Sequence, residues 1–512
     1  MKHKIFSILI SVFIATSLFA QSSSIDTKQL DSYIQQAQSN WEIPGLAISV
    51  IHKGEVVFEK GYGLRNLEKK QPVTPQTLFA VASNTKSFTS AALSQLVEQG
   101  RISRDDPVRK YLPYFTLYDP YVSETITIRD LLCHRAGFET FSGDLLWYGS
   151  SYTREEIIRR ARFLKPKYPF RTNFGYSNIM FIAAGEIIPA VTDTSWNDYI
   201  RHHFLEPLDM DNSNTSITEF KKNDNIAQPY HVVPGSEPIP LPYINWDNMA
   251  PAGAINSSVS EMRHWLSMHL NKGVYKGKKI LAEEQIHIMQ TPHTIKPVSI
   301  NAQKLWPGKH FEAYALGWNT FDYRGMKIVE HGGGADGMIS KTVMVPETDF
   351  AFVILTNSIN YLPAALMYYI LDMHAEVEPR DWSSFYHNFF MNRHIEEQKR
   401  LEKAEAERNK NTEPSLDLEA YTGTYTGDLY GAAEVKLEAG ALVLDFIPSP
   451  LFKGDLTHWQ YNTFKIELRD RPNLPPGTVN FILDENGKID EMRIDIPNPD
   501  FDFTELDFHK VK

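Results

Sequence analysis

Two residues three positions apart, Ser83 and Lys86, have the side-chain types that nucleophilic catalysis needs. A serine hydroxyl is a weak nucleophile until a neighbouring base takes its proton. Side chains three residues apart on a helix lie on the same face, so the Lys86 amine can reach the Ser83 hydroxyl. No other serine in the chain has a lysine at that offset. The spacing therefore predicts a serine nucleophile beside a lysine that activates it.

A helix is expected to position this pair. The apolar run Leu78–Ala82 leads into it at Ser83, apolar residues at helical spacing continue to Val97, and Gly100 ends it. A nucleophile in the first turn of a buried helix also lies near the positive end of that helix.

A second pattern, Tyr176-Ser177-Asn178, could move protons. A phenol near an ammonium group has a lowered pKa and can act as a proton shuttle. The Asn178 amide could bond to the lysine or to a substrate carbonyl. The alternative interpretation is a buried tyrosine beside a turn, because Tyr243-Ile244-Asn245 has the same pattern.

A third pattern, His331-Gly332-Gly333-Gly334, follows one predicted strand and precedes another. Successive glycines let the backbone approach a ligand without a Cβ atom in the way. A backbone amide there could stabilise an oxyanion. The alternative is a glycine-rich bulge or turn between strands.

The elements around these motifs predict an α+β fold. A helix is expected over residues 25–40, followed by a hairpin of strands Leu46–Ile51 and Val56–Tyr62. Residues from about 100 to 310 are mixed helix and loop. Four strands and a helix then follow: Ala315–Phe321, Met326–Glu330, Ile339–Val345, Phe350–Thr356 and the helix Ala364–His374. A sheet built from both ends of this region, beside a helical part, leaves a crevice between them for a site.

A second domain is expected after a charged linker or helix over residues 379–413. Beyond Pro414 six short alternating segments predict a small all-β sandwich or barrel. These segments are Ala433–Leu437, Ala441–Phe446, Thr463–Leu468, Thr478–Leu483, Glu491–Ile496 and Asp502–Phe508. The predicted organisation is thus a first domain over 25–378 and a second over 414–512, in agreement with a length of 512 residues.

The N-terminus has the pattern of an export signal. Lys2 and Lys4 precede an apolar run that ends at Ala20, which predicts a secretory signal peptide over residues 1–20. An uncleaved anchor is the alternative, disfavoured because the run is short for a membrane span. We therefore expect an exported protein, periplasmic or secreted, with no integral membrane segment after cleavage.

Charge and cysteine content exclude further classes. Without Lys2 and Lys4 the net charge changes from −11 to −13, which argues against nucleic-acid binding. Cys133 is the only cysteine, so no intramolecular disulfide can form, and we interpret it as a small core residue.

The order and spacing of the three motifs resemble those of the serine β-lactamase-like hydrolases. This family includes class C β-lactamases, DD-peptidases, and related esterases and D-amino-acid peptidases. Its members have Ser-x-x-Lys, Tyr-x-Asn and Lys/His-x-Gly motifs across an α/β sheet and a helical domain. Three further stretches, 61–63, 127–137 and 314–318, also look familial, and the resemblance covers roughly residues 30–375. The C-terminal part resembles the lipocalin-like barrel appended to some of these hydrolases, with Tyr421–Tyr425 as its opening.

The resemblance implies roles for individual residues. Ser83 would be the acylated nucleophile, and Lys86 would keep its hydroxyl activated. Tyr176 would be the main general base and acid, and Asn178 would contact Lys86 and the substrate amide. No metal and no organic cofactor is implied.

The resemblance also implies an oxyanion hole formed by the backbone N–H groups of Ser83 and Gly334, the latter following the triplet that Gly333 completes. His331 stands where the lactamases place a lysine. A fixed lysine charge favours the carboxylate of a β-lactam, whereas histidine is largely neutral at pH 7. This departure favours an esterase or peptidase over an efficient β-lactamase.

The predicted function is therefore an exported serine hydrolase that acts on small esters, amides or D-amino-acid peptides, and that could form homo-oligomers. The main alternative is a penicillin-binding or sensor module that is acylated with little turnover. An α/β-hydrolase is disfavoured because no Gly-x-Ser-x-Gly elbow follows the glycine run. A metalloenzyme is disfavoured because His264 and His269 lack a His-Glu-x-x-His pattern.

Overall fold

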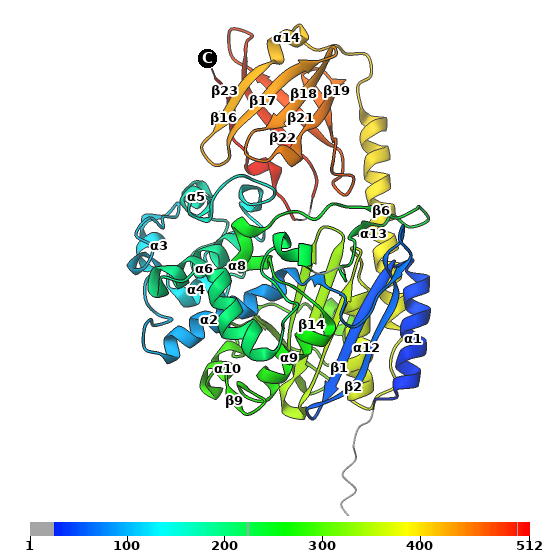
Figure 1. The fold of residues 1–512 in the computed structure, drawn as a ribbon. Coiled ribbons are helices and arrows are strands. Elements are labelled where there is room, and N and C mark those ends of the chain that lie inside the picture. Colours follow the sequence, from blue (N-terminus) through cyan, green and yellow to red (C-terminus); the bar gives the residue numbers. More distant parts are fainter. Residues whose placement is uncertain (1–24, 223–224, 499, 512) are drawn as a thin grey trace, which may run out of the picture.

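The computed structural model describes residues 25–222, 225–498 and 500–511. The predicted signal peptide lies outside these residues. A nine-stranded antiparallel sheet forms the centre of the larger part of the molecule (Figure 1), in the order β10-β11-β12-β13-β14-β15-β1-β2-β3. The strands are β1 Gly45–His52, β2 Glu55–Asn66, β3 Gln71–Pro72, β10 Thr294–Lys296, β11 Glu312–Tyr314, β12 Asn319–Tyr323, β13 Met326–Ala335, β14 Met338–Val345 and β15 Phe350–Thr356.

Strands from the two ends of this region meet at the centre of the sheet. β1 pairs with β15, Leu46 opposite Thr356, and with β2, Gly45 opposite Gly63. The apolar β15 is buried on both faces, because alternate side chains enter two different cores. α1 Thr27–Asn40 and α12 Leu362–His374 cover one face, and the helical region covers the other. The predicted α+β class, with helices flanking an antiparallel sheet, is confirmed.

The helical region lies beside the second face of the sheet (Figure 1). The first of its longer helices begins at Thr85, within the Ser-x-x-Lys motif. The longer helices are α2 Thr85–Glu98, α5 Arg154–Arg160, α6 Asn178–Thr192, α9 Val259–Leu270 and α10 Glu283–Met289, with the shorter α3 Pro120–Thr125, α4 Ile128–Leu132, α7 Trp196–Ile200, α8 Ala250–Gly253 and α11 Ile300–Leu305. Short two-residue strands accompany them: β4 Phe79–Ala80, β5 Tyr230–His231, β6 Ile239–Pro240, β7 Asn256–Ser257, β8 Val274–Tyr275 and β9 Lys278–Lys279. No helix among the described residues has both the length and the apolar composition needed to cross a membrane.

Two predicted strands differ from those observed. The expected strand Ala315–Phe321 is only partly observed: its first residues form a bend after β11, where Gly317 has φ +74°, and the strand β12 begins at Asn319. A Cβ atom on Gly317 would lie 2.8 Å from the backbone oxygen of Lys86, so only glycine fits this close approach. The strand predicted to end at Glu330 continues as β13 to Ala335. The glycine run is therefore part of a strand and not a turn.

The C-terminal part is a closed eight-stranded antiparallel barrel, one of the two architectures predicted. Its strands are β16 Gly423–Gly427, β17 Gly431–Glu438, β18 Ala441–Phe446, β19 Gly454–Gln460, β20 Thr463–Leu468, β21 Gly477–Leu483, β22 Ile489–Asp495 and β23 Phe508–Lys510, preceded by the short helix α14 Leu418–Tyr421. The six predicted segments missed β16 and β19, which contain glycine and many polar residues. The predicted strand Asp502–Phe508 is wrong: Phe503–Glu505 is a 3-10 turn, and β23 begins at Phe508.

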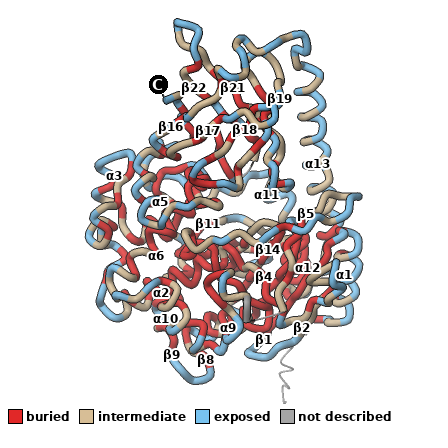
Figure 2. The backbone as a smooth tube through the Cα atoms, turned by 45° about the horizontal axis from the view of Figure 1, so that its top comes forward, coloured by how far each residue is buried: buried red, intermediate tan, exposed pale blue. Residues whose placement is uncertain are grey.

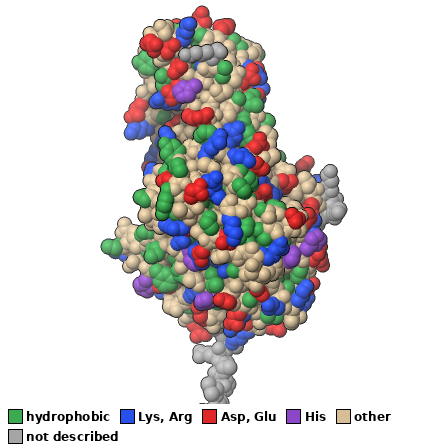
Figure 3. All heavy atoms as spheres, turned by 90° about the vertical axis from the view of Figure 1, so that its left-hand side faces the viewer, with side chains coloured by type: hydrophobic (Ala, Val, Ile, Leu, Met, Phe, Trp, Pro, Cys, Tyr) green, Lys and Arg blue, Asp and Glu red, His purple; other side chains and the backbone are tan. Residues whose placement is uncertain are grey.

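The charged segment between the two parts is the 26-residue helix α13, Trp382–Glu407. Its first turns pack aromatic side chains, including Trp382 and Tyr386, against the core beneath α12. The rest of the helix extends toward the barrel (Figure 1) and is largely exposed, whereas buried residues fill the sheet, the helical region and the inside of the barrel (Figure 2). Acidic and basic side chains are interspersed over the face drawn in Figure 3.

Candidate active site

Ser83 lies in a tight turn between β4 and α2, where the sheet meets the helical region. Residues Ala82–Asn84 form a 3-10 turn. Ala82, the residue directly before Ser83, has φ +47°. A left-handed conformation at a buried alanine is strained, and such strain persists only where surrounding contacts impose it. The Asn84 amide donates to Ser340 Oγ at 2.8 Å and accepts from Thr342 Oγ1 at 2.5 Å. These bonds fasten the Ser83 turn to β14.

Lys86 is fully buried and lies beside Ser83. Its Nζ is 3.1 Å from Ser83 Oγ, 2.6 Å from Asn178 Oδ1 and 2.8 Å from the backbone oxygen of Ala252. Burial lowers the pKa of Lys86 to about 7, although the charge of Asp144 acts in the opposite direction. The Asn178 and Ala252 oxygens can only accept hydrogen bonds. A neutral amine can therefore direct its two hydrogens to them and its lone pair to the Ser83 hydroxyl.

Asp144 completes this network, and sequence reasoning missed it. The Asn178 Nδ2 group donates to Asp144 Oδ2 at 2.6 Å, which orients the Asn178 oxygen toward Lys86. Burial raises the pKa of Asp144 to about 8. In the sequence, Asp144 could have been noticed as an acidic residue directly before the apolar Leu145-Leu146-Trp147. An Asp side chain is rarely buried unless it is paired with another group.

Tyr176 lies over the lysine, with Lys86 Nζ 4.7 Å from the centroid of its ring. The prediction that the ammonium lowers the pKa of Tyr176 is wrong. Burial raises that pKa above its usual value and outweighs the opposite effect of the Ser83 hydroxyl. Within the part of the chain that the structure describes, the Tyr176 hydroxyl has no hydrogen-bond partner. The phenol therefore stays protonated near neutral pH, and its O–H is free to donate to a substrate.

His331 is buried near Tyr176 and is neutral. Its Nδ1 lies 2.5 Å from the Gly332 carbonyl oxygen, which can only accept, so Nδ1 carries the proton. Its Nε2 lies 2.8 Å from the hydroxyl of Tyr314 and accepts from it. Burial lowers the pKa of His331 to about 3, and the nearby Lys86 acts in the same direction. The site thus has no fixed positive charge at this position.

Another buried histidine supports the Tyr-x-Asn segment. His134 Nδ1 accepts from the backbone N–H of Ser177 at 3.1 Å, and its ring lies 4.2 Å from the ring of Tyr176 and 4.5 Å from that of Tyr314, between centroids. Sequence reasoning gave no individual role to His134 or Tyr314, although both fall in stretches that it had noted as familial.

The glycines of β13 bring a strand backbone directly against the nucleophile. A Cβ atom on Gly333 would lie 2.3 Å from the Val81 oxygen and 2.9 Å from the Ser83 nitrogen. Gly334 follows, with only Ile339 Cδ1 at 3.7 Å from the equivalent position. The backbones of Ser83 and β13 therefore lie side by side, the arrangement that two converging oxyanion donors require.

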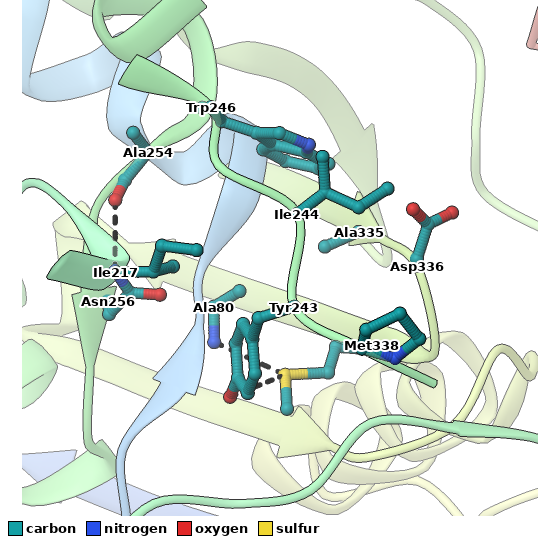
Figure 4. Close-up of a pocket in the computed structure, with 12 residues that line it drawn as sticks. Ala80, Ile217, Tyr243, Ile244, Trp246, Ala254, Asn256, Ala335, Asp336 and Met338 are labelled. Carbon is teal, nitrogen blue, oxygen red and sulfur yellow. Dashed lines mark hydrogen bonds between the residues drawn. The ribbon is translucent and has the colours of Figure 1, made fainter. Parts of the chain in front are cut away.

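A pocket opens beside this point (Figure 4). Ala80 and Ala335 form the part of its wall next to the nucleophile turn and the glycine run. Tyr243, Trp246 and Asp336 contribute larger side chains to the lining. Tyr243, whose sequence pattern imitates Tyr176, is thus a wall of the pocket, and its hydroxyl donates to the Ala227 oxygen at 2.8 Å.

Residues considered for other roles lie elsewhere. Cys133 is a buried core residue, as interpreted from the sequence. His264 bonds to the Leu208 oxygen through Nδ1, and His269 is buried among aromatic rings. Among the described residues, no group of three or more His, Cys, Asp or Glu side chains is arranged to hold a metal ion.

The comparison with known families agrees with this fold. The sequence profile of the family described as Beta-lactamase matches residues 30–369, and that of a domain of unknown function, DUF3471, matches residues 407–510. A β-lactamase-like sheet and helical region with a Ser-x-x-Lys centre define a class of serine hydrolases. The chain belongs to the Beta-lactamase family.

Two curated relatives align with about two thirds or more of the chain. The chain is 31% identical over 429 residues to the unguisins hydrolase ungD' of Aspergillus campestris (strain IBT 28561), which covers 78% of this chain and 75% of that protein. It is 28% identical over 341 residues to protein flp of Staphylococcus aureus (strain MW2), covering 66% of this chain and 64% of that protein.

Solved structures share the fold. The octameric penicillin-binding protein homologue from Pyrococcus abyssi has a TM-score of 0.63 at 24% identity, covering 95% of this chain and 100% of that chain. EstCE1, a hydrolase with promiscuous acyltransferase activity, has a TM-score of 0.54 at 21% identity, covering 65% of this chain and 94% of that chain.

Replacing Gly333 by alanine is expected to lower kcat/KM for an activated ester by about 10²-fold, because the new Cβ atom displaces the Ser83 turn from the strand. Gly332→Ala is the matched control on the same strand, since its Cβ atom would meet only the flexible end of Lys341, at 3.2 Å. Equal activities of the two variants would contradict the proximity of β13 to the nucleophile.

Proposed function

We propose that this protein hydrolyses small esters or amides, including peptides that contain D-amino acids, through an acyl-enzyme on Ser83. The observation that carries the proposal is the contact of 3.1 Å between Ser83 Oγ and the buried Nζ of Lys86. A lysine with a pKa of about 7 is half neutral near physiological pH and can accept the serine proton. The carbonyl oxygens of Asn178 and Ala252 hold that amine in place.

The proposed acylation step follows from these contacts. Ser83 Oγ bonds to the substrate carbonyl carbon while its proton moves to Lys86. The resulting oxyanion accepts from the backbone N–H groups of Ser83 and Gly334. The bond to the leaving group then breaks, and the leaving group takes the proton of the Tyr176 hydroxyl, which regains one from the Lys86 ammonium. In deacylation, a water oxygen bonds to the ester carbon while its proton moves to Lys86. The bond between that carbon and Ser83 Oγ then breaks, and Oγ takes the proton back.

The assignment of Tyr176 as acid and Lys86 as base follows from their pKa values. A phenol whose pKa is raised by burial is a poor anionic base near pH 7, whereas a lysine whose pKa is about 7 is a good base. The neutral His331, occupied on both nitrogens, supports an esterase or peptidase over an efficient β-lactamase, because no lysine charge attracts a β-lactam carboxylate there.

Turnover and acylation can be measured together to test the proposal. Purified protein is mixed with a 4-nitrophenyl ester, nitrophenol release is followed, and the intact protein mass is recorded within seconds and after many minutes. A hydrolase shows an acyl mass that disappears when the substrate is consumed. A persistent acyl mass with one nitrophenol per protein would instead support the sensor alternative.

Tyr176→Phe is expected to lower kcat for an amide substrate by about 10²-fold, the usual scale for loss of a general acid. The loss should be smaller for a nitrophenyl ester, because nitrophenolate leaves without a proton. Tyr323→Phe is the control, since it also removes a buried hydroxyl, one that donates to Asp372 at 2.8 Å on the opposite face of the sheet. Equal losses for both substrates would remove Tyr176 from the leaving-group step.

Two further parts of the proposal concern location and assembly. Export rests on the pattern of residues 1–20, and activity assays of cell fractions with and without these residues test it. Assembly into homo-oligomers is supported by the octameric penicillin-binding protein homologue from Pyrococcus abyssi, and light scattering of the purified protein tests it.

A further inference from the structure

The barrel is packed against the larger domain (Figure 1), at the segment that contains Tyr148 and Gly143. The Tyr148 ring stacks on Phe452 at 5.4 Å between centroids and lies 4.5 Å from Phe501. The Glu505 carboxylate accepts from the backbone N–H of Gly143 at 2.8 Å and from the Ser142 hydroxyl, directly before Asp144. The barrel therefore contacts the segment that carries a residue of the catalytic network.

A loop of the barrel between β20 and β21 places a cation in this interface. Arg471 in that loop is only 2% exposed. Its Nε and Nη1 atoms are buried without a hydrogen-bond partner, and no ion pair within 4.0 Å includes it among the described residues. A buried, unpaired charge costs several kcal/mol, so such a guanidinium is expected where a ligand supplies the missing anion.

An acidic group close to Arg471 already has hydrogen-bond partners. Asp336 accepts from Tyr148 OH at 2.7 Å on one oxygen and from Asn473 Nδ2 at 3.0 Å on the other. Its pKa is raised by burial, while Arg471 is near enough to act in the opposite direction. Asp336 therefore lies close to Arg471 without forming an ion pair with it.

Asp336 also connects Arg471 to the reaction centre. It lines the pocket beside the nucleophile, two residues after Gly334. A second unpartnered donor lies in the same wall: the Trp246 indole N–H is buried without an acceptor among the described residues, and its nitrogen is on the Asp336 side of the pocket (Figure 4). Trp246 lines the pocket and Arg471 lies close to Asp336 of the same wall, so two unsatisfied donor groups, one of them cationic, make this region suited to an anion.

We propose that Arg471 of the barrel binds a carboxylate on the substrate, next to Asp336 in the wall of the pocket. The planar guanidinium matches a carboxylate with two parallel hydrogen bonds. The inference rests on the proposed hydrolase function and narrows its substrates to esters or amides that carry a free carboxylate, such as peptides with a terminal or side-chain acid. The positive charge that is absent at His331 is then supplied by Arg471 of the barrel.

The test measures binding separately from turnover. The probes are 4-nitroanilide monoamides of dicarboxylic acids with four to eight carbons, each paired with the analogue in which the free acid is a carboxamide. Calorimetry on full-length wild-type protein and on Arg471→Met gives their Kd values. The matched control is Arg469→Met, because Arg469 is two residues away, exposed, and already paired with Asp455 and Glu438.

We expect the wild-type protein to bind one chain length of acid at least about tenfold more tightly than its carboxamide. Arg471→Met should abolish that preference, Arg471→Lys should keep part of it, and Arg469→Met should leave it unchanged. The unfolding midpoint of Arg471→Met should not fall, since an unpaired buried charge is removed. A purely structural arginine would instead lower the midpoint.

Two different results would overturn two different statements. Equal Kd values for acid and carboxamide at every chain length, or a preference that survives in Arg471→Met, would overturn the carboxylate subsite. Absence of Ser83-dependent nitroaniline or nitrophenol release would overturn the hydrolase function, whatever the Kd values show.

Discussion

Ser83→Ala is expected to reduce turnover of a nitrophenyl ester by about 10⁴-fold or more while leaving the fold intact. The change removes the atom to which the acyl group bonds, so no covalent intermediate can form. The unfolding midpoint should change little, since the change removes the hydrogen bond of the Ser83 hydroxyl to Lys86 and alanine retains the Cβ atom. Steady-state kinetics, intact protein mass and a thermal melt check these three expectations.

Ser90→Ala is the matched control for this experiment. Ser90 lies two turns further along α2, is buried, and its hydroxyl has no partner in the described part of the chain. Its replacement should leave turnover within about twofold of wild type, as for a site outside any interaction network. Substantial turnover by Ser83→Ala beside a normal Ser90→Ala would show that another residue is the nucleophile.

Local relationships made the centre of this site predictable. Ser83 and Lys86 are three residues apart, so the periodicity of a helix alone places them together. Asn178 follows Tyr176 by two residues, and the distances to Lys86 agree with the contact expected for its amide. Their convergence with His331, 245 residues away from Lys86, could be anticipated only from the order of motifs in a known family.

The electrostatics of the site depend on burial, which local sequence does not specify. The phenol of Tyr176 was expected to be more acidic because an ammonium lies near it. In the folded protein, loss of solvent around the hydroxyl is the larger effect and acts in the opposite direction. The same loss of solvent lowers the pKa of Lys86 to about 7, so in the proposed mechanism Lys86 is the base and Tyr176, expected to be both base and acid, is the acid alone.

Contacts between segments far apart in the chain could not be predicted from the local sequence either. Asp144 bonds to Asn178, which in turn bonds to Lys86, and Arg471 is buried in the separate barrel near the larger domain. The bend at Gly317 replaces the first part of a predicted strand, and the Lys86 backbone leaves no room for a side chain there. Each feature arises from tertiary packing that overrides a local preference.

The pH dependence of kcat/KM gives the second large expected effect. The reaction requires the neutral amine of Lys86, whose pKa is lowered by burial to about 7. Below that value Lys86 is protonated, so kcat/KM should fall about tenfold for each pH unit; above it the rate should reach a plateau. Lys86→Met should lose about 10²-fold or more at pH 8, and its remaining activity should lack this acid limb.

Asp144→Asn distinguishes the two groups that could produce that limb, because Asp144 itself has a raised pKa of about 8. If the limb belongs to Lys86, removal of the nearby negative charge destabilises the ammonium and moves the limb to lower pH. A limb that belonged to Asp144 would disappear in this variant. Lys86 and Asp144 are both buried and titrate as a coupled pair. The direction in which the acid limb moves therefore identifies which of the two must lose its proton before the reaction.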